Sequence, residues 1–478
     1  MHLKYYLLIF QLEAYRPLRF LRWIIRSRTQ GPNKNDVDKT KQPVWTAKAK
    51  QLYWLAIISF IGISLWLLLT QNILVSAVLI AVLWFNIYLC LILALAIIKP
   101  YEIINRLRVK QLIKNKINYL KENHHLTVIG ITGSFGKTSS KMVIGQVLPK
   151  CHITPKSYNT MFGIFKTIDY ELNKRYKFFV CEMGAYKKGD VKEFCELVSP
   201  DIGVLTGINE QHLERFGSIE NTIQAKFEIL TTLCPGGTGI INLDNELVRT
   251  NLPCFQKILE HKHIYLIGYS VNGESSEYCK EIIGIKNWHI ENNKSVFEFS
   301  YKDQTYKVST SLVGRGHLSN ILAAIAVALS CGQNIDDVIK RVSLIKQIPH
   351  RLELKLMPGI TILDDTYSSN PSGFREALDT LKQFAGTKVL ITPGIVELGD
   401  KALDIHKEIG GLAANICDEI VLVGSSHNLN AMKEGILSSG YKAEKITQLA
   451  GRAKVQEYLQ NKANTVVLME NDLPDQYL

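Results

Sequence analysis

The chain has 478 residues, which is enough for two or three domains with separate hydrophobic cores. Its nine cysteines form neither a CxxC pair nor a cluster with histidine, which argues against a disulfide framework and indicates reduced thiols in a cytosolic compartment. The formal net charge of +12 arises from 56 basic and 44 acidic residues. Much of the basic excess flanks an apolar segment near the N-terminus, so it favours contact with anionic lipid over binding of nucleic acid.

The first thirty residues mix aromatic and aliphatic side chains with five arginines. This composition is typical of an amphipathic helix that lies on an anionic inner leaflet, and a helix packed on a catalytic domain is the alternative. Residues 29–50 are polar and are expected to form a linker. Together, residues 1–50 are predicted to be a basic N-terminal segment.

Residues 51–98 contain no charged side chain. At the helical rise of about 1.5 Å per residue, this run is about twice as long as a hydrocarbon core of about 30 Å requires. The polar sequence Thr70-Gln71-Asn72 divides it into 52–69 and 73–98, which predicts a transmembrane hairpin with a short external turn. The alternative is a buried helical pair of a soluble protein.

Basic residues precede the predicted hairpin and follow it in the expected connector, 99–125. The positive-inside rule therefore places both flanks, and everything after them, in the cytoplasm.

The segment Thr132–Thr138 reads TGSFGKT and stands between an apolar run and a helical pattern that begins at Lys137. This arrangement is typical of a phosphate-binding loop, because its glycines let successive backbone N–H groups point at one anion. Lys137 adds a positive charge, and the Thr138 hydroxyl can ligate Mg²⁺. Ile131 stands where the general Walker pattern has its first glycine, so the loop is a shortened variant. The predicted ligand is ATP with Mg²⁺.

From residue 126 onward, short β-rich runs alternate with amphipathic helical stretches, which predicts parallel sheets flanked by helices. Residues 283–313 indicate antiparallel hairpins instead. The predicted fold class is α/β, with a P-loop-type parallel-sheet ATPase domain over 126–345 and a Rossmann-like α/β domain over 346–478. The expected strands are 126–132, 177–182, 201–208, 239–243, 263–268, 361–364, 388–392, 419–424 and 465–469.

Over about residues 126–465 the chain resembles the Mur ligase family of ATP-dependent amide-bond ligases. The segments that carry the resemblance stand in family order: Gly130–Thr138, Ser157–Thr160, Gly163, Glu182–Ala185, Asn209–Glu214, Ala225–Ile229, Asn242–Asn245, Gly314–Asn320, His350–Arg351, Asp364–Pro371 and Glu397–Asp400. It is strongest to the members that add D-alanyl-D-alanine, and it implies an enzyme of cell-wall precursor synthesis. The predicted hairpin and its basic flanks place this enzyme at the bacterial inner membrane, with the catalytic domains in the cytoplasm.

The resemblance implies that ATP phosphorylates a carboxylate and that an amine attacks the acyl phosphate. Lys137, Lys226, His212 and Asn159 are the implied catalytic residues, and Thr138, Glu182, His212 and Lys226 the implied Mg²⁺ site, with Lys226 carbamylated by CO₂. From the residues alone, Lys226 is an ordinary helical lysine, Glu182 a salt-bridged strand end and Asn320 a helix N-cap. The implied nucleotide site comprises Gly133, Ser134, Gly136, Lys137, Thr138, Ser139, Asn245, Asn320, Arg351, Asp365, Tyr367 and Asn370.

The sequence departs from the family pattern in four places. The usual N-terminal domain that grips uridine diphosphate has no counterpart, and the predicted hairpin occupies its place. Ser368-Ser369 replaces Asn-Ala, His317 stands where Asn is usual, and Met469–Asp475 stands where Lys-Gly-Ser is expected near the incoming dipeptide.

The membrane segment suggests that a cell-wall substrate is lipid-linked or made at the membrane, with an amino acid or dipeptide as the amine. Three alternatives remain open: a poly-γ-glutamate synthetase-like ligase, a membrane-anchored P-loop kinase of lipid sugars, and a non-catalytic ATP-binding scaffold.

Overall fold

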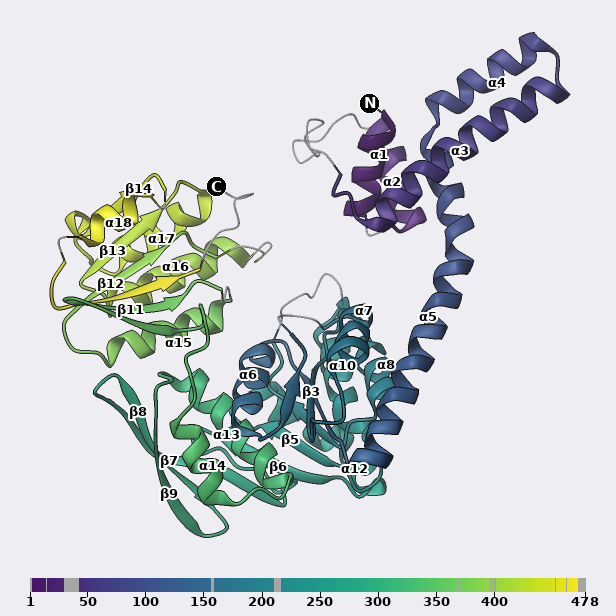
Figure 1. The fold of residues 1–478 in the computed structure, drawn as a ribbon. Helices are drawn as coiled ribbons and strands as arrows, with labels where there is room; N and C mark the ends of the chain where they lie inside the picture. Colours follow the sequence, from purple (N-terminus) through teal and green to yellow (C-terminus); the bar gives the residue numbers. More distant parts are fainter. Residues whose placement is uncertain are drawn as a thin grey trace. The chain divides into compact units, whose positions relative to one another are not determined.

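The computed structural model describes residues 2–13, 15–29, 43–155, 159–209, 216–367, 370–395, 398, 401–451, 453–460 and 462–471 (Figure 1). The contacts within the chain define two compact units, Met1–Leu112 and Ile113–Leu478. The first unit is helical, and the second contains two β-sheets. The division between the units falls inside the predicted connector 99–125, which is part of one long helix.

The first thirty residues form two helices, α1 (His2–Leu12) and α2 (Pro17–Thr29), where the sequence suggested one. Pro17 begins α2, since proline fits the first turn of a helix. Their apolar side chains, among them Phe10 and Phe20, are buried in a core shared with α3 (Ala47–Thr70) and α5 (Tyr88–His124). The apolar face of this segment therefore packs on the helices that follow it in the chain.

The predicted turn of the hairpin is confirmed. Helix α3 ends at Thr70, and α4 (Ile73–Phe85) begins after Asn72, whose side chain accepts a hydrogen bond from the Leu74 N–H at 3.1 Å. The expected second helix, 73–98, is wrong as a single element, because the chain breaks at Asn86. The Asn86 side chain donates to the Val82 carbonyl at 2.8 Å, as a cap that ends α4.

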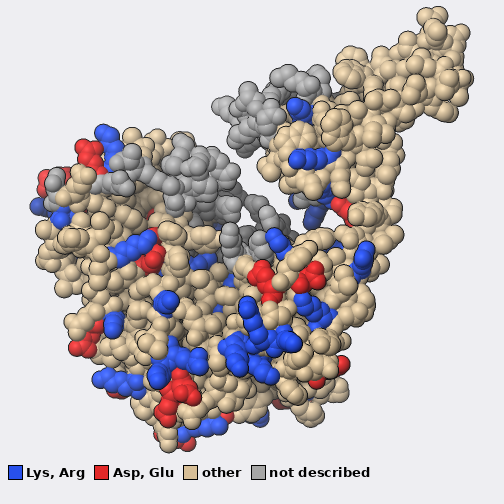
Figure 2. Space-filling view, in the orientation of Figure 1, with Lys and Arg blue, Asp and Glu red and all other residues tan. Residues whose placement is uncertain are grey.

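By length and composition, α3 with 24 residues and α5 with 37 could cross a membrane, as far as the described residues go. Helix α4 has 13 residues, or about 20 Å at the helical rise, which is short of a hydrocarbon core of about 30 Å. Many large apolar side chains of α3 and α4 are exposed. On the face shown in Figure 2, the outer part of this hairpin carries no charged side chain.

The first sheet of the second unit has nine strands in the order β2-β3-β1-β4-β5-β6-β7-β8-β9. Strands β2 to β7 pair in parallel in that order, while β8 and β9 continue the sheet as antiparallel neighbours of β7, as expected for 283–313. The strands are β1 (Thr127–Thr132), β2 (Cys151–Ile153), β3 (Phe178–Glu182), β4 (Ile202–Leu205), β5 (Thr238–Asn242), β6 (Tyr265–Ser270), β7 (Glu281–Glu291), β8 (Lys294–Tyr301) and β9 (Gln304–Thr310).

Helices cover both faces of this sheet. Helices α6 and α13 pack together on one face, over a core that contains Ile129, Val204 and Ile240, and α8 and α10 pack on β1 and β4 from the other side. The helices of this region are α6 (Lys137–Val147), α7 (Met161–Lys166), α8 (Asp190–Val198), α10 (Ile219–Thr231), α11 (Glu246–Asn251), α12 (Gln256–His261), α13 (Arg315–Ser330) and α14 (Ile335–Ser343).

The second sheet has six strands in the order β10-β11-β15-β12-β13-β14, and only the pair β10–β11 is antiparallel. Helices α15, α16 and α17 pack on one face, and α18 on the other. The elements are β10 (Glu353–Met357), β11 (Ile360–Asp365), α15 (Pro371–Lys382), β12 (Thr387–Thr392), α16 (Ala402–Ala414), β13 (Glu419–Val423), α17 (His427–Ser438), β14 (Ile446–Leu449), α18 (Ala453–Leu459) and β15 (Thr465–Glu470). The α/β fold with two parallel sheets predicted from the sequence is confirmed.

Candidate functional site

The predicted phosphate loop joins β1 to the first turn of α6, at the carboxyl edge of the first sheet. Gly136 precedes α6 with φ of 76°, a conformation that glycine adopts without strain. A Cβ atom at Gly133 would lie 2.1 Å from Thr206 Oγ1, so this position admits no side chain. The Ser134 N–H donates to the Gly207 carbonyl at 2.8 Å. The loop is therefore held against the end of β4, and the N-terminus of α6 is available to an anion.

Lys137 lies over this loop. Its Nζ donates to the carbonyl oxygens of Gly133 at 2.7 Å and Ser134 at 3.1 Å. Burial lowers the pKa of Lys137 to about 8, with the charge of Arg351 acting in the same direction and that of Glu182 against it. The ammonium is thus placed where phosphate oxygens would meet the loop.

Glu182 ends β3 directly beside the loop. The Thr138 hydroxyl donates to its carboxylate, with 3.0 Å to Oε1 and 3.1 Å to Oε2, and Lys141 Nζ lies 2.8 Å from Oε2. The side chains of Lys141 and Glu182 are only 1% and 2% exposed. A hydroxyl and a carboxylate are hard oxygen ligands of the kind that Mg²⁺ prefers, so the donor set at this edge fits a magnesium ion.

Lys226 lies on α10 with a side chain that is nearly fully buried. Its Nζ is 5.7 Å from the centre of the Phe216 ring, and within the described ranges no carboxylate lies at ion-pair distance. Burial lowers the pKa of Lys226 to about 7, with Lys137 acting in the same direction. Asp190 and Glu228 oppose this shift, but both carboxylates accept hydrogen bonds from backbone N–H groups. Lys226 is therefore a buried lysine with a weakly held proton.

The three predicted asparagines of the first sheet's domain occupy different positions. Asn159 lies against Gly184, just past the end of β3, where the Gly184 N–H donates to its carbonyl at 3.3 Å. Asn245 is the N-cap of α11, and its side chain also bonds to both backbone groups of Ile208. Asn320 is buried within α13 and accepts a hydrogen bond from the Ser140 hydroxyl at 2.7 Å. The N-cap alternative for Asn320 is thus wrong, and its amide lies beside the phosphate loop.

The predicted residues of the second sheet's domain gather at the carboxyl end of β11. The Arg351 guanidinium lies 4.6 Å from the centre of the Tyr367 ring, and its charge acts on Lys137. Asp365 is buried and accepts from the Leu352 N–H at 3.0 Å, and burial raises its pKa to about 7. The Asn370 side chain accepts from the Gly373 N–H at 2.9 Å as the N-cap of α15.

Arg351 marks the junction of the two domains. His350 and Leu352, on either side of it, have φ angles of 57° and 48°, which non-glycine residues rarely adopt. The backbone carbonyl of Arg351 accepts a hydrogen bond from His317 Nε2 at 2.7 Å. Burial lowers the pKa of His317 to about 4, so the ring is neutral and Nε2 carries its proton. Strained backbone of this kind often marks a hinge or a functional site.

The sequence analysis missed two buried charged residues at these edges. Lys141 follows Lys137 by four residues, and this spacing places both on one face of a helix. Glu470, on strand β15, pairs in register with Asp365 on the neighbouring strand β11, and its fully buried carboxyl group lies against that of Asp365. Burial and the Asp365 carboxyl raise the pKa of Glu470 well above its usual range. A charged residue at the end of a buried strand was the available signal.

Two predicted residues need separate mention. Ser139 is buried in the first turn of α6, next to the loop. His212, the expected second metal ligand, lies outside the described residues. The structure brings together the loop, Thr138, Glu182 and Asn320 by direct contacts. It joins Arg351 to this group through the effect of its charge on Lys137, and Lys226 through the effect of the Lys137 charge on its pKa.

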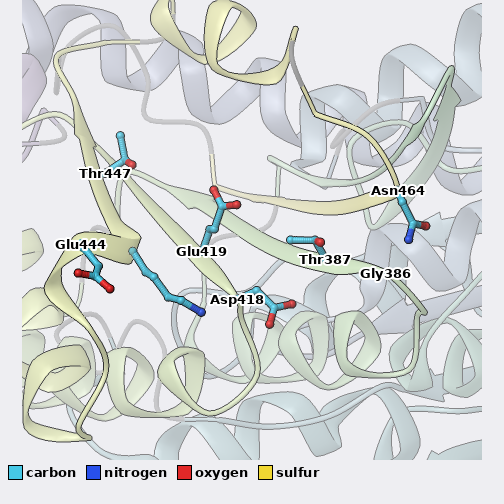
Figure 3. A pocket seen from close by; sticks show the side chains of 8 residues that line it. Gly386, Thr387, Asp418, Glu419, Glu444, Thr447 and Asn464 are labelled. Carbon is cyan, nitrogen blue, oxygen red and sulfur yellow. The ribbon is translucent and has the colours of Figure 1, made fainter.

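Two other polar features lie apart from this site. A cavity of about 520 Å³ is lined by Asp418, Glu419, Glu444 and Lys445, among others (Figure 3). It lies at the amino ends of β12 to β14, whereas ligands of open α/β sheets bind at the carboxyl ends. His350, Glu353 and Asp364 could in principle share a cation, but Lys355 already pairs with both carboxylates.

Two protein-family models match the two α/β domains that hold this site. The family model of the Mur ligase middle domain matches residues 131–328, and that of the Mur ligase, glutamate ligase domain matches residues 350–472. Together they cover about two thirds of the chain.

Similar proteins share one name. The UDP-N-acetylmuramoyl-tripeptide–D-alanyl-D-alanine ligase of Haemophilus influenzae is 27% identical over 301 residues, covering 61% of this chain and 62% of that protein. The enzyme of the same name from Escherichia coli is 27% identical, covering 65% and 67%. The chain thus spans less than two thirds of the length of the first relative.

Among solved structures, the MurF ligase of Thermotoga maritima in complex with ADP superposes with a TM-score of 0.64 at 25% identity, covering 77% of this chain and 80% of that one.

Proposed function

Because the chain belongs to the Mur ligase family, we propose that it is an ATP-dependent ligase that activates a carboxylate as an acyl phosphate and joins it to an amine. The observation that carries the proposal is the set of groups around the phosphate loop: the ion pair of Lys141 and Glu182, the Thr138 hydroxyl, and the lysines Lys137 and Lys226, whose pKa values are both lowered. A similar structure holds ADP, which supports the nucleotide.

In this proposal the N-terminus of α6 and Lys137 bind the phosphates of ATP. Negative charge redistributes over the oxygens while the phosphoryl group is transferred. Hydrogen-bond donors that are already aligned with these oxygens therefore stabilise the transition state more than the ground state. A magnesium ion held by Thr138 and Glu182 would neutralise part of that charge. Asn159 lies against Gly184, just past the end of β3, and is proposed to orient the carboxylate substrate. His212 is proposed as a second ligand of magnesium.

Lys226 is proposed to react with CO₂ as a neutral amine. A bond forms between Nζ and carbon, one C=O bond becomes a C–O⁻ single bond, and the nitrogen releases a proton to solvent. The product is an anionic carbamate that can orient the cation near the acyl phosphate. Burial supports this step because it keeps the amine neutral near pH 7, where an ordinary lysine is protonated.

The second domain is proposed to complete the site when it closes on the first. Arg351, Asp365 and Tyr367 lie at the carboxyl end of β11 and would approach the ribose and phosphates. Closure would exclude water, and hydrolysis of the acyl phosphate is the side reaction that must be avoided. The left-handed residues around Arg351 are candidates for the hinge.

For substrates, we propose a cell-wall precursor that carries a carboxylate and a D-alanyl-D-alanine-type dipeptide as the amine. The names of the relatives support this pair. We also propose that α3 and the adjoining helices anchor the enzyme in the bacterial inner membrane with its catalytic domains in the cytoplasm, on the strength of their length and exposed apolar side chains. An anchored enzyme could accept a lipid-linked precursor.

The test is phosphate release from ATP by the full-length protein in detergent, screened against pairs of carboxylate and amine. UDP-N-acetylmuramoyl tripeptide and its lipid-linked form are offered with D-alanyl-D-alanine or glutamate. Release that requires both an acid and D-alanyl-D-alanine, and that is lost in Lys137→Met, is the expected result. Release that requires glutamate would shift the substrate class, and no release with any pair would refute ligation.

A further inference from the structure

Helix α6 carries two lysines one turn apart: Lys137, which is half-buried and belongs to the phosphate loop, and Lys141, which is buried. Lys141 is 1% exposed and contacts Glu182 Oε2 at 2.8 Å. Ser140 and Val143, close to it on the helix, are fully buried as well, so Lys141 lies on the inward side of α6. A buried lysine requires an anion beside it, and Glu182 is that anion.

The carboxylate of Glu182 is equally dependent on its neighbours. Both oxygens accept from the Thr138 hydroxyl, and the Glu182 N–H donates to Thr154 Oγ1 at 3.2 Å. With backbone and carboxylate both bonded, the side chain has one orientation available. Lys141 therefore fixes the position of the group that is proposed, with Thr138, to hold the magnesium ion.

The ion pair also determines the charge of this site. Glu182 and Lys141 cancel, Thr138 is uncharged, and the charges of Lys137 and Arg351 act on the same region. Without nucleotide, the described groups around Thr138 are therefore net positive, which disfavours a free divalent cation. The phosphates of a bound nucleotide reverse that balance by adding several negative charges.

We propose that Lys141 is a positioning residue whose ion pair with Glu182 neutralises the site, so that the divalent cation enters only together with the triphosphate. This inference rests on the proposed function in one respect, namely that Thr138 and Glu182 form the metal site of a nucleotide. It assigns to Lys141 control over the order of binding, a property that the loop motif itself does not specify.

The experiment measures binding of Mn²⁺ to the full-length protein in detergent by electron paramagnetic resonance, with and without ADP. Lys141→Gln removes the charge and keeps an N–H donor for Glu182, whereas Lys141→Arg keeps the charge. Lys192→Gln, at an exposed residue of α8, is the matched control for loss of one positive charge. Without ADP, Lys141→Gln is expected to bind Mn²⁺ about tenfold more tightly than the wild type, while the other two variants bind as the wild type does.

The inference fails if Lys141→Gln, shown to be folded by circular dichroism, binds Mn²⁺ without ADP as weakly as the wild type. It fails equally if Lys141→Arg gains as much affinity, since loss of packing would then explain both. The wild type provides an independent measurement. If ADP does not increase its affinity for Mn²⁺, the proposal that the cation enters together with the nucleotide is contradicted. None of these titrations contains an acid or amine substrate, so failure of ligation in the phosphate-release assay remains a separate result.

Discussion

Replacing Lys226 with methionine is expected to make the protein more stable and to abolish ligation. The folded protein lowers the pKa of Lys226 from 10.5 to about 7, whereas the unfolded chain keeps the ordinary value. The unfolded state thus binds the extra proton, so the destabilisation is complete below pH 7 and fades as the pH rises toward 10.5. The shift corresponds to roughly 4–5 kcal/mol at low pH. Methionine has a similar length and no charge, so most of that cost disappears.

The same shift favours the carbamylation proposed for Lys226. At pH 7 about half of the folded molecules hold a neutral Lys226 amine, against roughly one in 3,000 for an ordinary lysine. Only the neutral amine attacks CO₂. Stability is therefore sacrificed at this position for reactivity, a conflict that is common at active sites.

Thermal melting of the wild type and Lys226→Met at pH 6 and pH 9 tests this reasoning. The variant is expected to melt several degrees higher at pH 6, with a smaller difference at pH 9, and to release no phosphate. Lys192→Met, on the surface of α8, should show neither effect. A variant that melts below the wild type at pH 6 would refute the argument, because it would mean that the folded state stabilises the ammonium.

Three further outcomes follow from the structure. Gly133→Ala places a Cβ atom 2.1 Å from Thr206 Oγ1, and it should weaken binding of a fluorescent ATP analogue at least about tenfold, as measured by titration. Burial and Asp365 raise the pKa of Glu470, so the contribution of its neutral form to stability is present at low pH and lost as the pH rises. Glu470→Gln should therefore raise the melting temperature at pH 8, corresponding to a gain of about 1–3 kcal/mol in the free energy of unfolding, and change it little at pH 5. In vesicles, brominated acyl chains should quench the fluorescence of Trp66 on α3, and an unquenched Trp66 would exclude an inserted helix.

The central strands of both sheets could be predicted because they are buried on both faces. Strands such as β1 and β12 are largely apolar runs, and this pattern can be recognised without knowing how the side chains pack. The strands that were missed, β2, β10 and β14, all lie at sheet edges, and none of their residues is buried. An edge strand contacts fewer neighbours, so its sequence is less constrained and carries a weaker signal.

The apolar segment shows the limit of composition. An uncharged run predicts helices, but it does not fix where they end, because the break at Asn86 depends on one side chain that caps α4. The predicted connector 99–125 carried no expected secondary structure for a related reason. Residues 99–124 are charged and apolar in turn, a pattern that a long helix tolerates as well as a linker does, and α5 continues through Pro100 without ending.

The functional site was predictable as a motif and less so as a set of contacts. The loop residues follow from one stretch of sequence. The partners of Glu182 come from α6, however, and the partner of Asn320, Ser140, lies 180 residues earlier in the chain. Which of the two lysines on α6 meets a carboxylate is decided by how the helix packs on β3. Sequence spacing placed Lys141 on the correct face but gave no reason to look there.

The charges of the site lead to one further consequence. Lys226 is buried and Lys137 and Arg351 are half-buried, and desolvation lowers the pKa of all three cations. The one buried carboxylate among the described loop contacts, Glu182, is already paired with Lys141. Such a site opposes folding until anions enter it. Because a ligand that binds only the folded state stabilises it in proportion to its concentration, a nucleotide relieves this repulsion and couples its own binding to the stability of the domain. The same cations that destabilise the free protein therefore favour the binding of a polyanion such as the proposed nucleotide.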